Sequence, residues 1–272
     1  MSVDYDAYHA TGRTATFDDV FERVRARTVE WILRREPELR TTGTLLDLGS
    51  GEGRYLGLWQ RVNPGAAVVA AEVSAVASER SARRYPDVRH LVADAQDVPL
   101  PDESVDAIVS IEVIEHVPSG VEMLREMRRL LKSGGWALIS TPCGNRGSFP
   151  WLLARFGGQL SAGREGGVGF GRIDDPTHLR VYRRRELERL CRASGLEVRR
   201  TYLSGHLFTH LAERLELAVK RRVDIRRRSA RADERFSRAL DAVALADLRL
   251  LRSLPNASTM LLVLRKPQHG AP

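Results

Sequence analysis

The residues best suited to chemistry lie in the stretch Ser110 to Val117, SIEVIEHV. Glu112, Glu115 and His116 stand at positions i, i+3 and i+4, so a helical turn after a strand would bring two carboxylates and an imidazole to one face. Oxygen ligands favour Mg²⁺ or Mn²⁺, and an imidazole nitrogen shifts the preference toward Mn²⁺, Fe²⁺ or Zn²⁺. The stretch Asp174 to His178, DDPTH, offers a fourth ligand further along the chain. The residue types therefore indicate a divalent-cation site.

Two other interpretations of this cluster stay open. In the first, no metal is bound, His116 acts as a general base or contacts the substrate, and Glu112 supports it; these two residues are then the catalytic candidates. In the second, the cluster is structural, and His178 only caps or orients the segment that follows it. A metal titration separates the first interpretation from a cation site.

The elements that must position the cluster begin with Leu45 to Leu56, LLDLGSGEGRYL. An apolar run that carries Asp47 is followed by Gly49, Gly51 and Gly53, and a helical pattern resumes after them. This pattern predicts a buried parallel strand, a tight turn and a helix start. Glycine lacks a Cβ and adopts positive φ, so its backbone can approach a ligand closely. The first turn of the helix adds free N–H groups.

The spacing of this turn distinguishes it from a dinucleotide site. Dinucleotide turns read G-x-G-x-x-G, whereas here Asp47 precedes glycines at alternate positions. A carboxylate at that place favours a ligand with an ammonium or sulfonium charge over a pyrophosphate. The stretch resembles motif I of the Rossmann-like S-adenosylmethionine methyltransferases; an ordinary turn in another α/β protein is the alternative. The resemblance implies an α/β fold with a seven-stranded sheet, its last strand antiparallel, and S-adenosylmethionine as cofactor.

A second strand is expected from Ala67 to Val73, with Glu72 near its end. An acid about 20 residues after the glycine turn is placed to accept hydrogen bonds from a ribose diol. A surface acid that caps the next helix is the alternative for Glu72. These two interpretations differ in whether the carboxylate faces the ligand.

The next two strands carry further cofactor candidates. Val88 to Val92 reads as a third strand, and the resemblance places the following Asp94 and Ala95 against the adenine. Ala107 to Ile111 reads as the fourth strand, and its last residue, Ile111, is also assigned to the cofactor. The pieces occur in the order and at the distances of the family, so the prediction of S-adenosylmethionine does not depend on the glycines alone.

The second half of the chain continues the pattern. Expected elements are a helix at Gly120 to Leu131, a turn at Lys132 to Gly135, a strand at Trp136 to Thr141, a helix at Leu187 to Ala193, and strands at Leu196 to Tyr202 and Ser258 to Leu264. The core of the methyltransferase unit is thus expected at 42–202, with an insertion at 142–177. A helical, arginine-rich insertion follows at 203–255, and the last strand and tail occupy 256–272. Both insertions should lie over the carboxyl ends of the strands and shape the acceptor pocket.

Residues 1–41 are expected to form an N-terminal helical cover. Apolar residues from Phe17 to Leu33 follow roughly helical spacing, and Pro37 closes the pattern. In the resembling family such a segment often covers the cofactor, so Tyr5 and Tyr8 are candidates to line it. Solvated tyrosines in a loose terminus are the alternative.

The cation cluster carries a narrower resemblance. Glu112, Glu115, His116 and His178 match the E-x-x-E-H motif and later histidine of the small-RNA 2′-O-methyltransferases, and the chain also resembles the ubiquinone-biosynthesis O-methyltransferases. The resemblance implies that Mg²⁺ or Mn²⁺ binds two vicinal oxygens of the acceptor and lowers the pKa of a hydroxyl group.

Charge gives one further clue about partners. The 272 residues carry a net charge of +8, and only Lys132, Lys220 and Lys266 among the 43 basic residues are lysines. Residues 183–235 hold 16 Lys and Arg against 8 Asp and Glu, which accounts for the whole surplus. This segment is compatible with a solvated helical lid, with phosphate of RNA or of a phosphorylated or lipid-linked acceptor, and with an anionic membrane. It lacks the interleaved aromatics that stack single-stranded bases.

These observations predict an S-adenosylmethionine-dependent methyltransferase that methylates a hydroxyl group of a small metabolite or sugar. The alternatives are an RNA 2′-O-methyltransferase, an N- or C-methyltransferase with His116 as general base, and a non-catalytic module that binds the cofactor. No apolar run reaches the length of a membrane span and no signal peptide is recognisable, so a soluble, cytoplasmic protein is expected. Cys143 and Cys191 form no disulfide framework.

Overall fold

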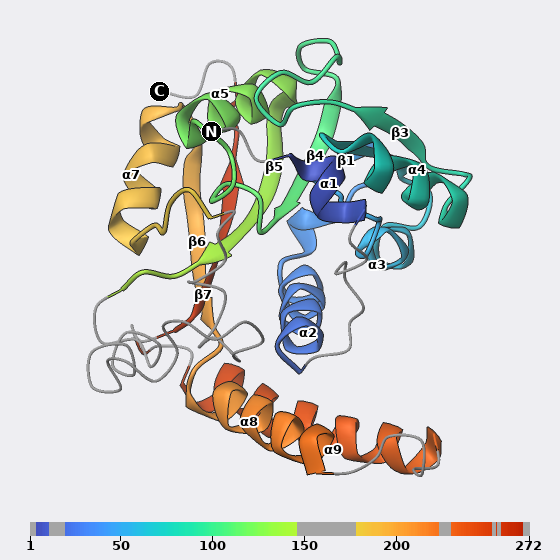
Figure 1. Cartoon of the computed structure of the whole chain (residues 1–272). Helices are drawn as coiled ribbons and strands as arrows, with labels where there is room; N and C mark the ends of the chain where they lie inside the picture. The colour runs from blue at the N-terminus through green and yellow to red at the C-terminus, as the bar shows by residue number, and fades with distance from the viewer. Residues whose placement is uncertain are drawn as a thin grey trace.

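The computed structural model describes residues 4–10, 20–145, 178–222, 230–251, 254 and 257–268. One sheet with the strand order β3-β2-β1-β4-β5-β7-β6 forms its centre (Figure 1). Its strands are β1 (Thr44–Leu48), β2 (Ala67–Glu72), β3 (Arg89–Val92), β4 (Val105–Ile111), β5 (Leu131–Pro142), β6 (Glu197–Ser204) and β7 (Thr259–Arg265). Strand β7 is antiparallel to β5 and β6, and the remaining pairs are parallel. The predicted Rossmann-like methyltransferase sheet is confirmed.

Helices cover both faces of the sheet. They are α1 (Tyr5–Ala10), α2 (Val20–Arg35), α3 (Leu56–Val62), α4 (Ala75–Arg84), α5 (Gly120–Leu130), α7 (Arg184–Ala193), α8 (Leu207–Arg222) and α9 (Ala230–Leu250), with a short 3₁₀ turn at Pro37–Leu39. Helix α2 stops just before Pro37, since a proline disfavours helical backbone in the residue before it. No helix among these described residues is long and apolar enough to cross a membrane.

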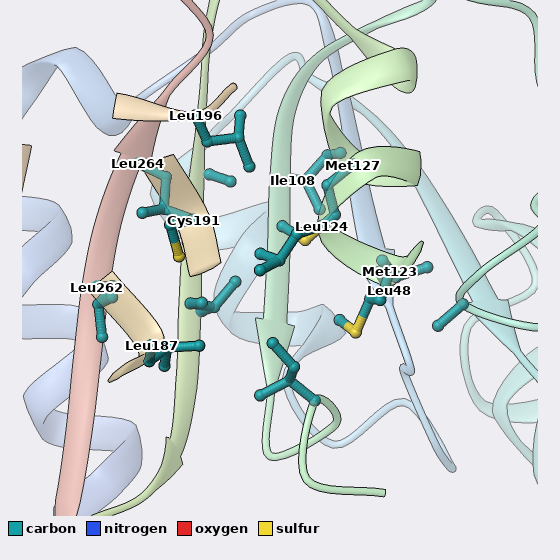
Figure 2. Packing of buried hydrophobic residues seen from close by; sticks show 14 of the residues in the cluster. Leu48, Ile108, Met123, Leu124, Met127, Leu187, Cys191, Leu196, Leu262 and Leu264 are labelled. Atoms are coloured by element: carbon teal, nitrogen blue, oxygen red, sulfur yellow. The ribbon is translucent and has the colours of Figure 1, made fainter. Parts of the chain in front are cut away.

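Alternation along β1 divides the core into two layers. Leu46 and Leu48 face a cluster built with α5 and α7, and Figure 2 shows Leu124 and Met127 of α5 and Cys191 of α7 close to the strands. The intervening residues face the opposite layer, which contains side chains of α2 and α3, including Ile32, Leu33 and Trp59. Because the central strands are buried on both faces, they read as nearly continuous apolar runs in the sequence.

The expected turn at Lys132 to Gly135 is absorbed into β5. This strand already begins at Leu131, which pairs with Val105, and the register shifts before Ala107 pairs with Trp136. Gly134 takes a φ of 76° and its N–H donates to the carbonyl of Lys266 at 3.1 Å. The glycine therefore makes an irregularity at the start of the strand, where the sequence suggested a separate turn.

Helices α8 and α9 stand between β6 and β7 in the chain and pack against α2. Val20 and Val24 of α2 form a small core with Ala212 of α8 and with Leu240 and Ala244 of α9. Helix α2 and the insertion formed by α8 and α9 thus meet at the carboxyl edge of the sheet, where β6 ends (Figure 1). Of the other predicted insertion, 142–177, residues 146–177 lie outside the described part of the chain.

Candidate active site

The glycine turn after β1 has the backbone that only glycine adopts readily. Gly49, Gly51 and Gly53 have φ values of 77°, 54° and 76°. A Cβ on Gly49 would lie 2.3 Å from Val113 Cγ2, and a Cβ on Gly53 would lie 2.4 Å from Ser81 Oγ. A Cβ on Gly51 would meet no atom within 4 Å. Two of the glycines therefore permit packing, whereas Gly51 exposes its backbone to open space that a ligand can enter.

Glu72 at the end of β2 holds this turn. Its Oε2 accepts a hydrogen bond from Gly51 N at 2.8 Å, and its Oε1 accepts one from Ser74 N at 3.0 Å. Each carboxylate oxygen has a second lone pair for a further donor. The predicted contact with a ribose diol stays a prediction, and the structure adds a bracing role that the sequence did not indicate.

Asp47 lies beneath the turn on the α3 side of the sheet. It is buried, and its Oδ2 accepts a hydrogen bond from Trp59 Nε1 at 2.7 Å. Burial raises the pKa of Asp47 to about 7 against the lowering effect of this hydrogen bond, and the charge of Glu72 raises it further. The carboxyl group therefore titrates near neutral pH, where a nearby cationic ligand would favour its ionised form.

The remaining cofactor candidates lie at the ends of β3 and β4. Asp94 is exposed and its Oδ1 accepts a hydrogen bond from Gln96 N at 2.8 Å, while Ala95 and Ile111 are buried. Val73 and Val92 are exposed beside Glu72 and Asp94, respectively, which gives this edge of the sheet an apolar surface that the sequence analysis did not single out.

The loop after β4 is not helical where the sequence suggested a shared helical face. Glu112 adopts a left-handed φ of 58°, His116 N donates to the carbonyl of Val113 at 2.8 Å, and α5 begins only at Gly120. The loop therefore sends Glu112 in a different direction from Glu115 and His116.

Glu115, His116 and His178 come together. One ligand atom from each lies within 4.8 Å of the other two, and the imidazole rings of His116 and His178 are 4.7 Å apart between centroids. His178 reaches the loop because the next residue, Leu179, donates its N–H to the carbonyl of Glu115 at 2.9 Å. The predicted downstream histidine thus joins two of the three residues of the E-x-x-E-H motif.

Glu115 is fully buried at the centre of this cluster. Its Oε2 accepts a hydrogen bond from Thr141 Oγ1 at 3.0 Å, whereas its Oε1 has no hydrogen-bond partner in the described part of the chain. Burial, joined by the charge of Glu112, raises the pKa of Glu115 well above its ordinary value. A buried carboxylate oxygen without a donor costs about 1–3 kcal/mol, so this atom favours a proton or a cation beside it.

Glu112 belongs to a different, buried cluster of charges. Its Oε2 lies 3.0 Å from Arg25 Nη2, and its Oε1 accepts a hydrogen bond from Ser140 Oγ at 2.8 Å. Arg25 Nη1 also lies 3.2 Å from both carboxylate oxygens of Glu22, which in turn pairs with Arg54 of the glycine turn. Helix α2 is thereby tied to both loops that border the site.

The sequence analysis missed Arg25, Glu22 and Arg54. A signal was present, because Glu22 and Arg25 share helical spacing with Val29 and Ile32, both of which are buried against the sheet. Charged residues on the apolar stripe of an amphipathic helix indicate a buried ion pair.

Tyr5 lies beside His116. Its hydroxyl donates to the carbonyl of His116 at 3.3 Å, and the two rings meet edge to face at 6.4 Å. Helix α1 is held over α4 by Ser74 Oγ, which donates to Asp6 Oδ1 at 2.6 Å. The structure thus brings Tyr5 to the candidate catalytic histidine; the side chain of Tyr8 is outside the described set.

Comparison with known proteins agrees with this geometry. Residues 20–201 match the family described as a methyltransferase domain. The chain belongs to this methyltransferase family. The matched range includes the glycine turn, Glu72, Asp94 and the loop that carries His116.

Two similar curated proteins are named as methyltransferases. The methyltransferase is 34% identical over 132 residues to a probable S-adenosylmethionine-dependent methyltransferase of Mycobacterium tuberculosis, covering 48% of this chain and 47% of the relative. It is 34% identical over 116 residues to a malonyl-[acyl-carrier protein] O-methyltransferase of Marinomonas, covering 41% and 42%. The chain therefore spans about half the length of these curated relatives or less.

A solved structure shares the fold over almost its whole length. A putative sarcosine dimethylglycine methyltransferase from Galdieria sulphuraria superposes with a TM-score of 0.60 at 18% identity, covering 97% of this chain and 99% of that one. At this identity the likeness concerns the fold alone.

Alanine at two glycines should separate packing from ligand approach. Gly51→Ala should weaken binding of S-adenosylhomocysteine at least tenfold in calorimetry, because its Cβ enters open space beside the turn, and should lower stability by only about 1–2 kcal/mol of backbone strain. Gly49→Ala should destabilise more, since its Cβ collides with Val113. If Gly51→Ala bound S-adenosylhomocysteine as tightly as wild type, the turn would not be part of the cofactor site.

The pH dependence of the unfolding free energy should reflect the raised pKa of Asp47. Its pKa of about 7 in the folded chain exceeds the unfolded value of about 3.9, so its contribution to stability is greatest below pH 4 and falls as pH rises to 7. In urea unfolding without cofactor, Asp47→Asn should gain roughly 2–3 kcal/mol relative to wild type between pH 5 and pH 7.5. If the unfolding free energies of wild type and Asp47→Asn changed in parallel with pH, the raised pKa of Asp47 would be contradicted.

Proposed function

We propose that this chain transfers the methyl group of S-adenosylmethionine to a hydroxyl oxygen of a small metabolite or sugar, and that Glu115, His116 and His178 hold a divalent cation that activates the hydroxyl group. The observation that carries the proposal is the buried Glu115, whose Oε1 has no hydrogen-bond donor among the described residues and whose carboxylate has an oxygen within 4.8 Å of a ring nitrogen of both His116 and His178. The proposal replaces the four-ligand set of the sequence motif with three protein ligands.

The residues around the glycine turn fit the cofactor. Gly51 offers its backbone to open space and Glu72 offers a carboxylate beside it, which suits an amino-acid moiety and a ribose diol. Exposed Val73 and Val92, with Asp94 beyond them, suit the apolar face and the polar edge of an adenine. The cofactor supplies an electrophilic methyl group on a sulfonium centre. Asp47, ionised by that positive charge, balances it from below the turn.

The donor set also fits a transition-metal ion better than Mg²⁺. One carboxylate oxygen and two imidazole nitrogens favour Mn²⁺, Fe²⁺ or Zn²⁺, and small side-chain rotations can bring atoms within 4.8 Å to coordination distance. Bound there, such a cation supplies Lewis-acid chemistry that lowers the pKa of a hydroxyl group. Thr141 holds the second oxygen of Glu115, and Tyr5 contacts the backbone of His116, so both ligands are oriented by neighbours.

Glu112 takes a supporting role in this proposal. Arg25 and Ser140 occupy its two oxygens, so it neutralises the buried guanidinium and fixes the loop that carries His116. Oxygen as the acceptor atom is favoured by the carboxylate–imidazole donor set and by the O-methyltransferase of Marinomonas among the relatives.

Calorimetric titration of Mn²⁺ in the presence of S-adenosylhomocysteine tests the three-ligand site. Wild type should bind close to one equivalent, and His116→Ala and His178→Ala should each weaken binding by roughly 10–100-fold or more, as loss of a ligand or its support does. Glu112→Gln should lose clearly less affinity than His116→Ala, because the Glu112 carboxylate is engaged with Arg25. Glu122→Gln removes an exposed carboxylate that pairs with Arg125 on α5; it is the matched control and should keep its affinity within about threefold.

Two results would overturn the cation site. Equal losses in Glu112→Gln and His116→Ala would restore the four-ligand motif. An absence of Mn²⁺, Fe²⁺ and Zn²⁺ binding in a wild type that still binds the cofactor would leave His116 as a general base, which a bell-shaped pH profile of methylation on hydroxyl acceptors would then show.

A further inference from the structure

Helix α8 directs its leucines to solvent. Leu207, Leu211 and Leu215 stand at successive i, i+4 positions and are 49%, 46% and 46% exposed. The opposite side of the helix faces the protein through Thr209, Ala212 and Glu216, which are buried. Small and polar residues thus make the inward contact, while an ordinary amphipathic helix would bury the leucines. An apolar stripe that packing leaves exposed indicates an interaction surface.

One basic residue with a described side chain accompanies this leucine face. Arg214 is exposed and lies between Leu211 and Leu215 in the helix. Among the residues of α8 whose side chains the structure describes, the leucine face includes no acidic residue, and Glu216 accepts a hydrogen bond from Val20 N on the inward side. Exposed leucines beside an arginine, in a segment with a surplus of positive charge, match the composition of helices that bind anionic lipid surfaces.

From this geometry we propose that the leucine face of α8 docks the methyltransferase onto an anionic lipid surface. The leucines enter the boundary between headgroups and acyl chains, and Arg214 meets lipid phosphates. The surrounding segment 183–235, with 16 basic and 8 acidic residues, adds long-range attraction to the same charge. The proposal is independent of the acceptor and of the cation site.

A second copy of the chain fits this face less well. Two-fold pairing would place the same patch on both sides of the interface, so Arg214 of one copy would meet the same positively charged face of the other, and the described side chains of this face include no acid to balance it. An anionic lipid surface offers the complementary charge across the whole stripe.

The docked orientation is set by the fold. Helix α8 follows the carboxyl end of β6, and Figure 1 shows α8 and α9 along one end of the molecule, with α5 at the other end. The site cluster belongs to the carboxyl end of β4, on the same edge of the sheet as the start of α8. Docking through α8 therefore brings the acceptor side of the sheet toward the lipid.

Vesicle flotation tests the proposal with the full chain. Wild type should float with vesicles of phosphatidylglycerol and phosphatidylcholine in equal parts, should bind pure phosphatidylcholine at least roughly tenfold more weakly, and should lose binding as salt rises. Leu211→Gln with Leu215→Gln should reduce binding about tenfold. Arg214→Glu should reduce it about fivefold, while Arg125→Glu, the same charge change at an exposed position of α5, should stay within about twofold of wild type.

Cofactor binding and thermal unfolding of each variant establish that it is folded. Equal flotation of the leucine double variant and wild type, or equal losses in Arg214→Glu and Arg125→Glu, would overturn the proposal. So would a wild type that does not float, whether it stays monomeric in light scattering, forms a dimer that the leucine substitutions dissociate, or binds an acidic protein through this face.

Discussion

The buried ion pair between Arg25 and Glu112 is the constraint on which the site depends. Burial alone would lower the pKa of the Arg25 guanidinium, but the charges of Glu112 and Glu22 raise it above its ordinary value, so the group stays charged inside the protein. Removing the partner of a buried charge strongly lowers the stability of the folded protein. Helix α2 is therefore fixed to the loop after β4 through Glu112 and to the glycine turn through Glu22 and Arg54.

This pairing also decides which carboxylate is available for chemistry. Arg25 and Ser140 hold the carboxylate of Glu112. If Glu112 turned toward the histidines, the buried guanidinium of Arg25 would lose this anionic partner. Glu115, three residues on, has one oxygen without a hydrogen-bond donor in the described part of the chain, and its carboxylate lies near His116 and His178. The left-handed backbone at Glu112 separates the two side chains, so two similar residues of one motif take different roles. Helix α2 also packs against helices α8 and α9, so one helix contacts both this insertion and the loops of the site.

The seven-stranded sheet and the choice of His178, 62 positions after His116, came from the resemblance to known methyltransferases. Local spacing predicted the strands, the glycine turn and the acids at the strand ends, because each is a property of consecutive residues. Local spacing could not show that Glu112 and Glu115 have different partners, since this depends on a backbone conformation and on an arginine almost 90 residues earlier in the chain. The outward direction of the α8 leucines was equally hidden, because periodicity defines a face and only packing against α2 and α9 gives its direction.

A double-mutant cycle on Arg25 and Glu112 tests the central claim most directly. Urea unfolding of Arg25→Met should show a loss of roughly 3–5 kcal/mol, because a carboxylate is left buried, and Glu112→Gln in the same chain should restore at least about 1 kcal/mol of it. Affinity for S-adenosylhomocysteine should follow the same pattern, since Arg25 also supports the turn through Glu22. Effects on stability that add within about 0.5 kcal/mol, with unchanged cofactor affinity, would show that the pair does not hold the two loops together.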